Sequence, residues 1–221
     1  VMLVQAVVVS FVMILWPLRR LRHTHTVRKP LGLVLYFSAL GLGFMLLEIT
    51  LLQRFVLFLG YPTYSLSVVM FSLLVSAGVG SMLTARVPVV PRTLLMASVT
   101  TLVIEVMLFH WLAPQVFAAA LSAPLSARVA ISVALLAPLG LVLGTFFPTG
   151  IRLIEAIDPR LVPWAWAVNG CTTVIGTILS VVLAMTYGFG LVAACATGIY
   201  VIGSVALLAS TRTATAVRPV A

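Results

Sequence analysis

Residues 40–81 read LGLGFMLLEITLLQRFVLFLGYPTYSLSVVMFSLLVSAGVGS, an apolar run that contains a single acid, Glu48. A carboxylate in the hydrocarbon of a bilayer costs on the order of 3 kcal/mol, so a helix that keeps one usually turns it toward protein, water or a ligand. Counting back from Glu48 in helical steps gives Met45, Gly41 and Ser38, a narrow face of small or adaptable side chains. The spacing predicts that Glu48 points into a helix bundle and that another helix approaches this face closely.

A turn divides the same stretch at residues 60–63, where Gly-Tyr-Pro-Thr interrupts the apolar run. Turn residues between two long apolar segments predict a helical hairpin. The first arm is long, since a helix over residues 31–59 would reach ~43 Å, against about 30 Å for the hydrocarbon core of a bilayer. We therefore expect this helix either to tilt strongly or to leave the bilayer over residues 51–59.

The composition is that of a membrane protein. Of the 221 residues, 62% are hydrophobic and 8% are charged, and the mean hydropathy is +1.25. A soluble domain would carry roughly 25% charged residues. The basic residues that give the net charge of +9 lie at the ends of apolar runs. This placement indicates membrane topology and contact with anionic lipid, not with nucleic acid. Cys171 and Cys195 both lie inside apolar runs and are interpreted as small packing residues, without a disulfide or a thiolate metal site.

The predicted fold class is all-α, a polytopic transmembrane bundle forming one domain over residues 1–221. Residues 2–18 carry no small-residue cleavage site before Arg19, so they are interpreted as a first span and not as a removed signal peptide. The chain opens on Val, which suggests a fragment or a processed product. Seven spans are expected, at residues 2–18, 31–54, 63–85, 92–112, 128–147, 163–187 and 190–210.

The basic residues predict the orientation. With these spans, 11 of the 13 fall on one side of the membrane and two, Arg54 and Arg128, on the other. Lys and Arg are enriched in cytoplasmic loops, so the N-terminus is expected outside and the C-terminus in the cytoplasm. The eleven are Arg19, Arg20, Arg22, Arg28, Lys29, Arg86, Arg92, Arg152, Arg160, Arg212 and Arg218.

Two features are expected to shape the bundle after the hairpin. Gly140 and Gly144, one turn apart in the fifth span, predict a close helix–helix contact. The uncharged residues 113–127, bounded by Pro114 and Pro124, fit a short surface helix or a plain loop equally well.

Few polar residues lie within the spans, and they define a candidate intramembrane site. Glu105 shares a helix face with Ser98, and Asn169 and Thr173 begin a small and polar stripe in the sixth span. Contact between helices explains such a stripe better than a substrate path does. Arg54 and Arg128 are the candidate ion-pair partners of the two acids, Glu48 and Glu105.

The sequence carries no motif for catalysis or for a cofactor. Nucleophile-elbow, phosphate-loop and dinucleotide-binding patterns are absent from the sequence. His23 and His25 have the spacing of a ligand pair but lack a nearby third ligand, so no metal site is expected. No catalytic residue is assigned, no cofactor is expected and the cofactor-binding residues are unknown; this chain alone is not expected to be an enzyme.

Three blocks together resemble a known family. They are residues 42–81 around Glu48, PLGLVLGTFFPTGIRL from Pro138 and LVPWAWAVNG from Leu161. The combination resembles the membrane half of bacterial spermidine synthase-like integral membrane proteins, the fused major-facilitator/spermidine synthase type. In that family a Rossmann-like transferase domain accompanies the helices, and this chain has no counterpart of it. The resemblance implies the hairpin and a bacterial cytoplasmic membrane location, but carries over no enzymatic activity.

Two functions remain open from the sequence. The leading interpretation is an integral membrane scaffold or subunit that acts with other protein subunits or a separate soluble domain. The alternative is a carrier of a small cation or polyamine whose path uses Glu48, Glu105 and Asn169.

Overall fold

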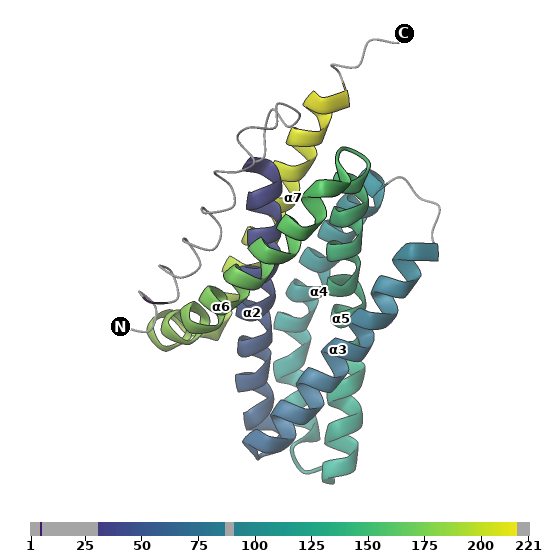
Figure 1. Ribbon diagram of the computed structural model, residues 1–221. Coiled ribbons are helices and arrows are strands. Elements are labelled where there is room, and N and C mark those ends of the chain that lie inside the picture. Colours follow the sequence, from purple (N-terminus) through teal and green to yellow (C-terminus); the bar gives the residue numbers. More distant parts are fainter. Residues whose placement is uncertain (1–4, 6–30, 87–90, 216–221) are drawn as a thin grey trace.

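The computed structural model describes residue 5, residues 31–86 and residues 91–215, and it is helical throughout its long elements (Figure 1). Six of the helices are long and apolar enough to cross a membrane. This confirms the all-α prediction and indicates a polytopic membrane protein. The first predicted span, His23 and His25 fall outside the described residues. The elements are α2 (Leu31–Leu59), α3 (Pro62–Arg86), α4 (Pro91–Ala120), α5 (Leu125–Glu155), the 3-10 turn η1 (Pro159–Leu161), α6 (Val162–Tyr187) and α7 (Phe189–Thr215).

Helix α2, which carries Glu48, is the central element. In its most apolar window 61% of the residues are buried, against 17–33% for the other five spans. It contacts α6 and α7 on one side and α3 and α5 on the other (Figure 1). A buried helix can be apolar all round, because every face meets protein. The stretch that decides the fold therefore forms the core of the bundle.

Glycines set the close helix contacts. A Cβ added at Gly144 would overlap the backbone of Ala77 in α3, and one added at Gly140 would lie 2.7 Å from the Ser76 Cβ. The close helix–helix contact predicted from the glycine spacing is thus confirmed, and the partner helix is α3. On α2, Gly43 lies against the Tyr200 ring of α7. Small residues at these points let the backbones approach, which supplies the dispersion contacts that hold helices together in lipid.

The hairpin prediction is also confirmed. Helix α2 ends at Leu59, Gly60 takes a φ of 89°, and α3 begins at Pro62. A positive φ is accessible to glycine without a Cβ clash, and proline is well suited to a first helical turn. The Arg128 Nη1 donates to the Phe58 carbonyl oxygen at 3.0 Å, which satisfies an acceptor that the end of α2 leaves free. Helix α2 is continuous from Leu31 to Leu59 and so extends five residues beyond the expected span end at Arg54.

Helix α4 is longer than the predicted span, because it continues through Pro114 to Ala120. Neither a separate surface helix nor a loop over residues 113–127 forms; the break is limited to residues 121–124. The Phe117 ring stacks on Phe58 with centroids 4.3 Å apart and meets Phe55 at 5.1 Å. This aromatic packing against α2 offsets the hydrogen bond that the proline removes.

Helix α5 likewise extends beyond the predicted end at Phe147, through Pro148, to Glu155. The Tyr36 hydroxyl donates to the Phe146 carbonyl oxygen at 2.7 Å, and the Arg152 Nη1 donates to the Thr84 carbonyl oxygen at 3.1 Å. Contacts with α2 and α3 hold these last two turns in helical form. Beyond it, the Asp158 carboxylate accepts from the Arg160 backbone N–H at 3.0 Å, which holds the pKa of this carboxyl below its usual range.

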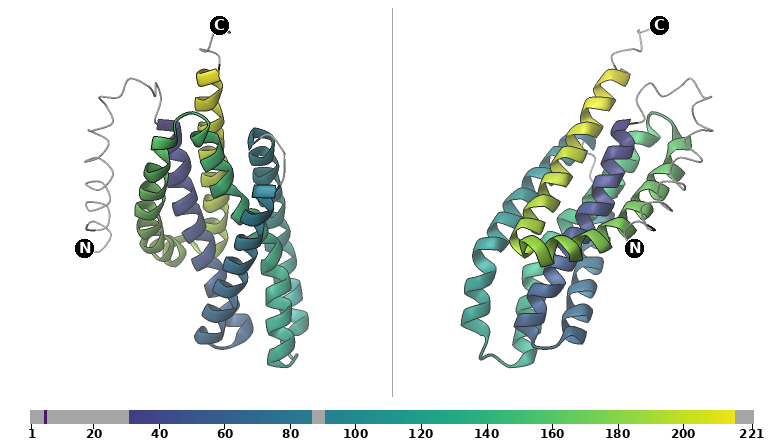
Figure 2. Two further views of the ribbon diagram at one scale, coloured as in Figure 1. Left: turned by 45° about the vertical axis from the view of Figure 1, so that its right-hand side comes forward. Right: turned by 90° about the vertical axis from the view of Figure 1, so that its left-hand side faces the viewer.

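One pair of helices stops short of the others. The α6–α7 turn ends well before the α2–α3 and α4–α5 turns, as both views in Figure 2 show. Helices α2 to α5 therefore form a longer four-helix unit, and α6 and α7 cover only part of α2.

Candidate functional site

Glu48 is 5% exposed in the middle of α2. It shares a helix face with Gly41, which lies seven residues earlier. A Cβ added at Gly41 would overlap the backbone oxygen of Asn169, and one added at Gly176 would come within 3.1 Å of the Met45 Cβ. The prediction that another helix approaches this face closely is confirmed, and the helix is α6.

Neither candidate ion-pair partner, Arg54 or Arg128, contacts Glu48. Arg128 donates to the end of α2. Arg54 follows on the same unbroken helix but on another face. Within the described ranges, Glu48 has no hydrogen-bond or ion-pair partner. Glu48 is thus a buried acid with no polar partner from this part of the chain.

Glu105 lies on the α4 face that meets α5. Ser98, seven residues earlier on this face, shares a 2.7 Å hydrogen bond with the Thr145 hydroxyl. The Glu105 Oε2 is buried and has no hydrogen-bond partner among the described residues. One oxygen of this half-buried second acid is therefore also directed into the bundle, without a hydrogen-bond partner in the described part of the chain.

The two acids lie at the same level of the bundle. On α2, Phe37 contacts the Phe147 ring, with centroids 5.3 Å apart, and Phe58 accepts from Arg128. This antiparallel register brings Glu48 opposite residues 136–138 of α5. The Ser98–Thr145 contact brings Glu105 opposite the same residues. Pro138 lies there, and its missing N–H removes one helical hydrogen bond from α5.

Asn169 and Thr173 lie apart from the acids. They meet α2 at Gly41, about two helical turns, or ~10 Å, from Glu48. The Thr173 hydroxyl donates to the Asn169 carbonyl oxygen at 2.8 Å, so it is satisfied within its own helix. The four predicted residues therefore do not form one cluster.

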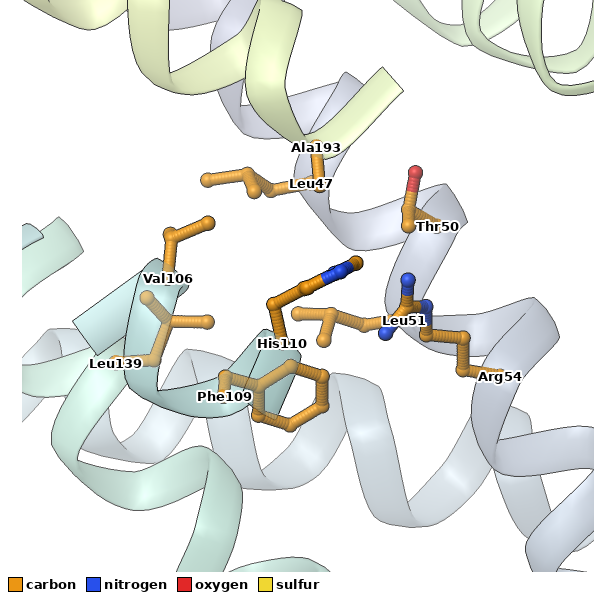
Figure 3. Close-up of a pocket in the computed structure, with 9 residues that line it drawn as sticks. All are labelled: Leu47, Thr50, Leu51, Arg54, Val106, Phe109, His110, Leu139 and Ala193. Atoms are coloured by element: carbon orange, nitrogen blue, oxygen red, sulfur yellow. The ribbon is translucent and has the colours of Figure 1, made fainter. Parts of the chain in front are cut away.

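A crevice between α2, α4, α5 and α7 lies near Glu48 and holds a basic pair that the sequence analysis did not connect. Its volume is about 20 Å³, which is room for about one water molecule. Arg54 and His110 enter it from α2 and α4 (Figure 3). Both residues lie in apolar runs at the same predicted end of the bundle, which is the signal that could have connected them. The full lining is Leu47, Thr50, Leu51, Arg54, Val106, Phe109, His110, Leu139 and Ala193.

Metal chemistry has no candidate centre in the part of the chain that the structure describes, where no group of three or more His, Cys, Asp or Glu side chains gathers. Cys171 lies in α6 and Cys195 in α7, and no disulfide joins them. No family model, no curated protein and no solved structure matches the chain.

Proposed function

We propose that this chain is an integral membrane subunit that serves as a scaffold in a larger complex. The closed packing around the acids supports this proposal. Helix α2 meets the α6 backbone at Gly41 and the Tyr200 ring of α7 at Gly43, and the crevice of about 20 Å³ is far too small for a polyamine. A carrier needs a central cavity that opens to each side in turn, usually where helices are discontinuous. Helix α2 is continuous at Glu48.

The resemblance of the three sequence blocks to spermidine synthase-like membrane proteins extends this proposal. In the extended form, the chain lies in a bacterial cytoplasmic membrane with seven spans, its N-terminus outside and its C-terminus in the cytoplasm. Its partner is another subunit or a separate soluble domain on the cytoplasmic side. The clustering of basic residues at one end supports the orientation.

The second candidate is a carrier of a small cation. The observation that favours it is a pair of carboxyls at one level of the bundle, Glu48 and Glu105, for which the described residues provide no partner. Ionisable groups inside a membrane domain commonly mark an ion or proton path. In this alternative, a bound cation supplies the positive charge that would neutralise the two carboxylates.

Purification of the native chain in a mild detergent tests the choice. A scaffold is expected to co-purify with other subunits in fixed ratio, and the isolated chain should move neither potassium nor spermidine into liposomes. Uptake by the isolated chain that Glu105→Gln abolishes, while Glu155→Gln at the exposed end of α5 leaves it intact, would replace the scaffold by the carrier.

A further inference from the structure

The turn between α6 and α7 lies short of the α2–α3 turn, and this difference in level leaves a step on the surface of the bundle. Ala193 of α7 lies beside Leu47 in the crevice, so α7 begins near residue 51 of α2, whereas α2 continues to Leu59. Leu57 lies on the α2 face that α7 covers further along, and it is 79% exposed. We call this uncovered side of α2, between the level of the α6–α7 turn at Gly188 and the α2–α3 turn at Gly60, the step. Figure 2 shows the different levels of the two turns.

The length of α7 fixes the level of the step in a bilayer. Helix α7 has 27 residues, and its apolar part before Thr211 and Arg212 is about 33 Å long, which matches a hydrocarbon core of about 30 Å. Helices α2 to α5 pass the α6–α7 turn and therefore enter the headgroup region. Trp111 and Tyr187 are 65% and 64% exposed near the step, as expected of aromatic residues at a membrane interface.

The crevice beside the step is lined by electropositive groups. Arg54 and His110 line the crevice there, and the ring and the guanidinium point into it from two helices (Figure 3). A Cβ added at Gly190, in the first turn of α7, would lie 3.6 Å from the His110 Cε1. The first backbone N–H groups of a helix lack intrahelical acceptors and carry a partial positive charge. A permanent cation, an imidazole and a helix N-terminus thus surround one small opening.

These groups have no anion in the described part of the chain. Arg54 is partly buried and forms neither a hydrogen bond nor an ion pair among those residues. A guanidinium removed from water is stabilised chiefly by a carboxylate or phosphate that accepts from its planar fork. Glu48 and Glu105, the nearest acids in sequence to the two basic residues, point elsewhere in the bundle.

We propose that the step binds one phospholipid, whose phosphate group lies against Arg54, His110 and the first turn of α7. Phosphates are abundant at this level of a bilayer, and their geometry suits bidentate contact with arginine. The exposed Leu57 side chain lies on the headgroup side of this phosphate, and the acyl chains extend the other way, along the bundle toward the bilayer centre. The crevice itself admits only the inner oxygens, and the rest of the headgroup occupies the step outside it.

Native mass spectrometry of the purified full chain with added phosphatidylglycerol tests the proposal. One lipid should remain bound, and diacylglycerol with the same acyl chains should not. Arg54→Gln should weaken binding by about tenfold or more, since a charge-assisted hydrogen bond contributes at least that factor. Arg86→Gln is the matched control, because Arg86 is an exposed arginine at the opposite end of α3. It removes the same charge and should leave binding unchanged.

Three results would overturn the proposal: equal retention of diacylglycerol, equal loss of lipid in Arg54→Gln and Arg86→Gln, or complete displacement of the lipid by millimolar inorganic phosphate. The last would identify a free anion as the ligand. If Arg54→Gln does not fold, His110→Gln takes its place, because His110 is exposed and outside the core. It should lower lipid affinity by roughly threefold or more with an unchanged unfolding temperature, and unchanged affinity would also refute the site.

Discussion

Glu48 illustrates how far a single residue determines the interpretation of the chain. Its place in an apolar run predicts an inward direction, and its burial in α2 agrees. The identity of its neighbours depends on helix register, which the sequence does not contain. Arg54 and Arg128 are the cations that the sequence offers as ion-pair partners for Glu48. In the structure, however, Arg54 lines the crevice and Arg128 caps the end of α2. Sequence reasoning thus located the acid but not its surroundings.

Glu48→Gln is expected to leave the unfolding temperature unchanged or to raise it by roughly 2–4 °C. A neutral amide removes the cost of placing an ionisable group in an apolar interior, and a change of about 1 kcal/mol has this effect on a chain of this size. An ion-paired Glu48 would give the opposite result, because its stranded partner would destabilise the bundle. Thermal unfolding in detergent measures the shift.

The control for this prediction is Glu155→Gln, which makes the same change at an exposed position at the end of α5. Its unfolding temperature should stay within about 1 °C of the parent, as for most surface substitutions. A marked fall in Glu48→Gln alone would show that a basic group outside the described residues neutralises Glu48.

At the scale of elements, the sequence predicted which segments are helical better than where they end. The Gly60–Pro62 turn was predictable, since it depends on local backbone preferences. The ends of α4 and α5 were not, because two prolines suggested termini while distant aromatic and polar contacts keep the chain helical. The contact through Gly140 and Gly144 was predictable as a spacing, but its partner α3 was not.

Gly144→Leu is expected to destabilise the bundle by roughly 2–3 kcal/mol, which lowers the unfolding temperature by about 5–10 °C. Any side chain at this position would overlap the Ala77 backbone, and backbone cannot rotate away as a flexible side chain can. Gly78→Leu is the matched control, because a Cβ there meets nothing within 4 Å. An equal shift for the two variants would show that helix propensity, and not the α3–α5 contact, dominates.

Arg128 and Arg152 attach the two ends of α5 to the last turns of α2 and α3, respectively. A cation at a helix C-terminus contributes about 1 kcal/mol, so Arg128→Met should speed amide exchange about fivefold at the end of α2. The Gly60 N–H, which donates to the Val56 carbonyl oxygen at 2.9 Å, is a suitable reporter. Exchange measured by NMR or mass spectrometry checks this.

Arg152→Met provides the reciprocal control, since it should speed exchange near Thr84 and leave Gly60 unchanged. Equal acceleration at both ends in either variant would mean that the bundle opens as one unit. It would contradict a local capping role for the two arginines.

At the scale of the whole molecule, the helix directions bring distant turns to common ends. The α2–α3 and α4–α5 turns lie at one end of the bundle, and the ends of α3 and α5 lie at the other (Figure 1). Among the described residues, four arginines lie at the second end, Arg86, Arg92, Arg152 and Arg160, whereas Arg54 and Arg128 lie toward the first. This asymmetry supports the proposed orientation, in which the second end faces the cytoplasm.

Cysteine labelling of the full chain in intact cells tests that orientation. In a background with Cys171 and Cys195 replaced by alanine, Thr63→Cys and Ser122→Cys should react with a membrane-impermeant maleimide, because both are exposed at the first end. Ala85→Cys, exposed at the second end, should react only after permeabilisation. Choosing Ala85 over the neighbouring arginine keeps the charge bias intact.

Each labelling pattern has a distinct meaning for the molecule. Labelling of Ala85→Cys in intact cells, with Thr63→Cys and Ser122→Cys protected, would invert the proposed orientation but keep the helix arrangement. Opposite accessibility of Thr63→Cys and Ser122→Cys would contradict the arrangement itself, because the two turns would then lie on different sides of the membrane. The orientation follows from the charges and the common location of the turns follows from the packing, so this one experiment tests the two physical arguments separately.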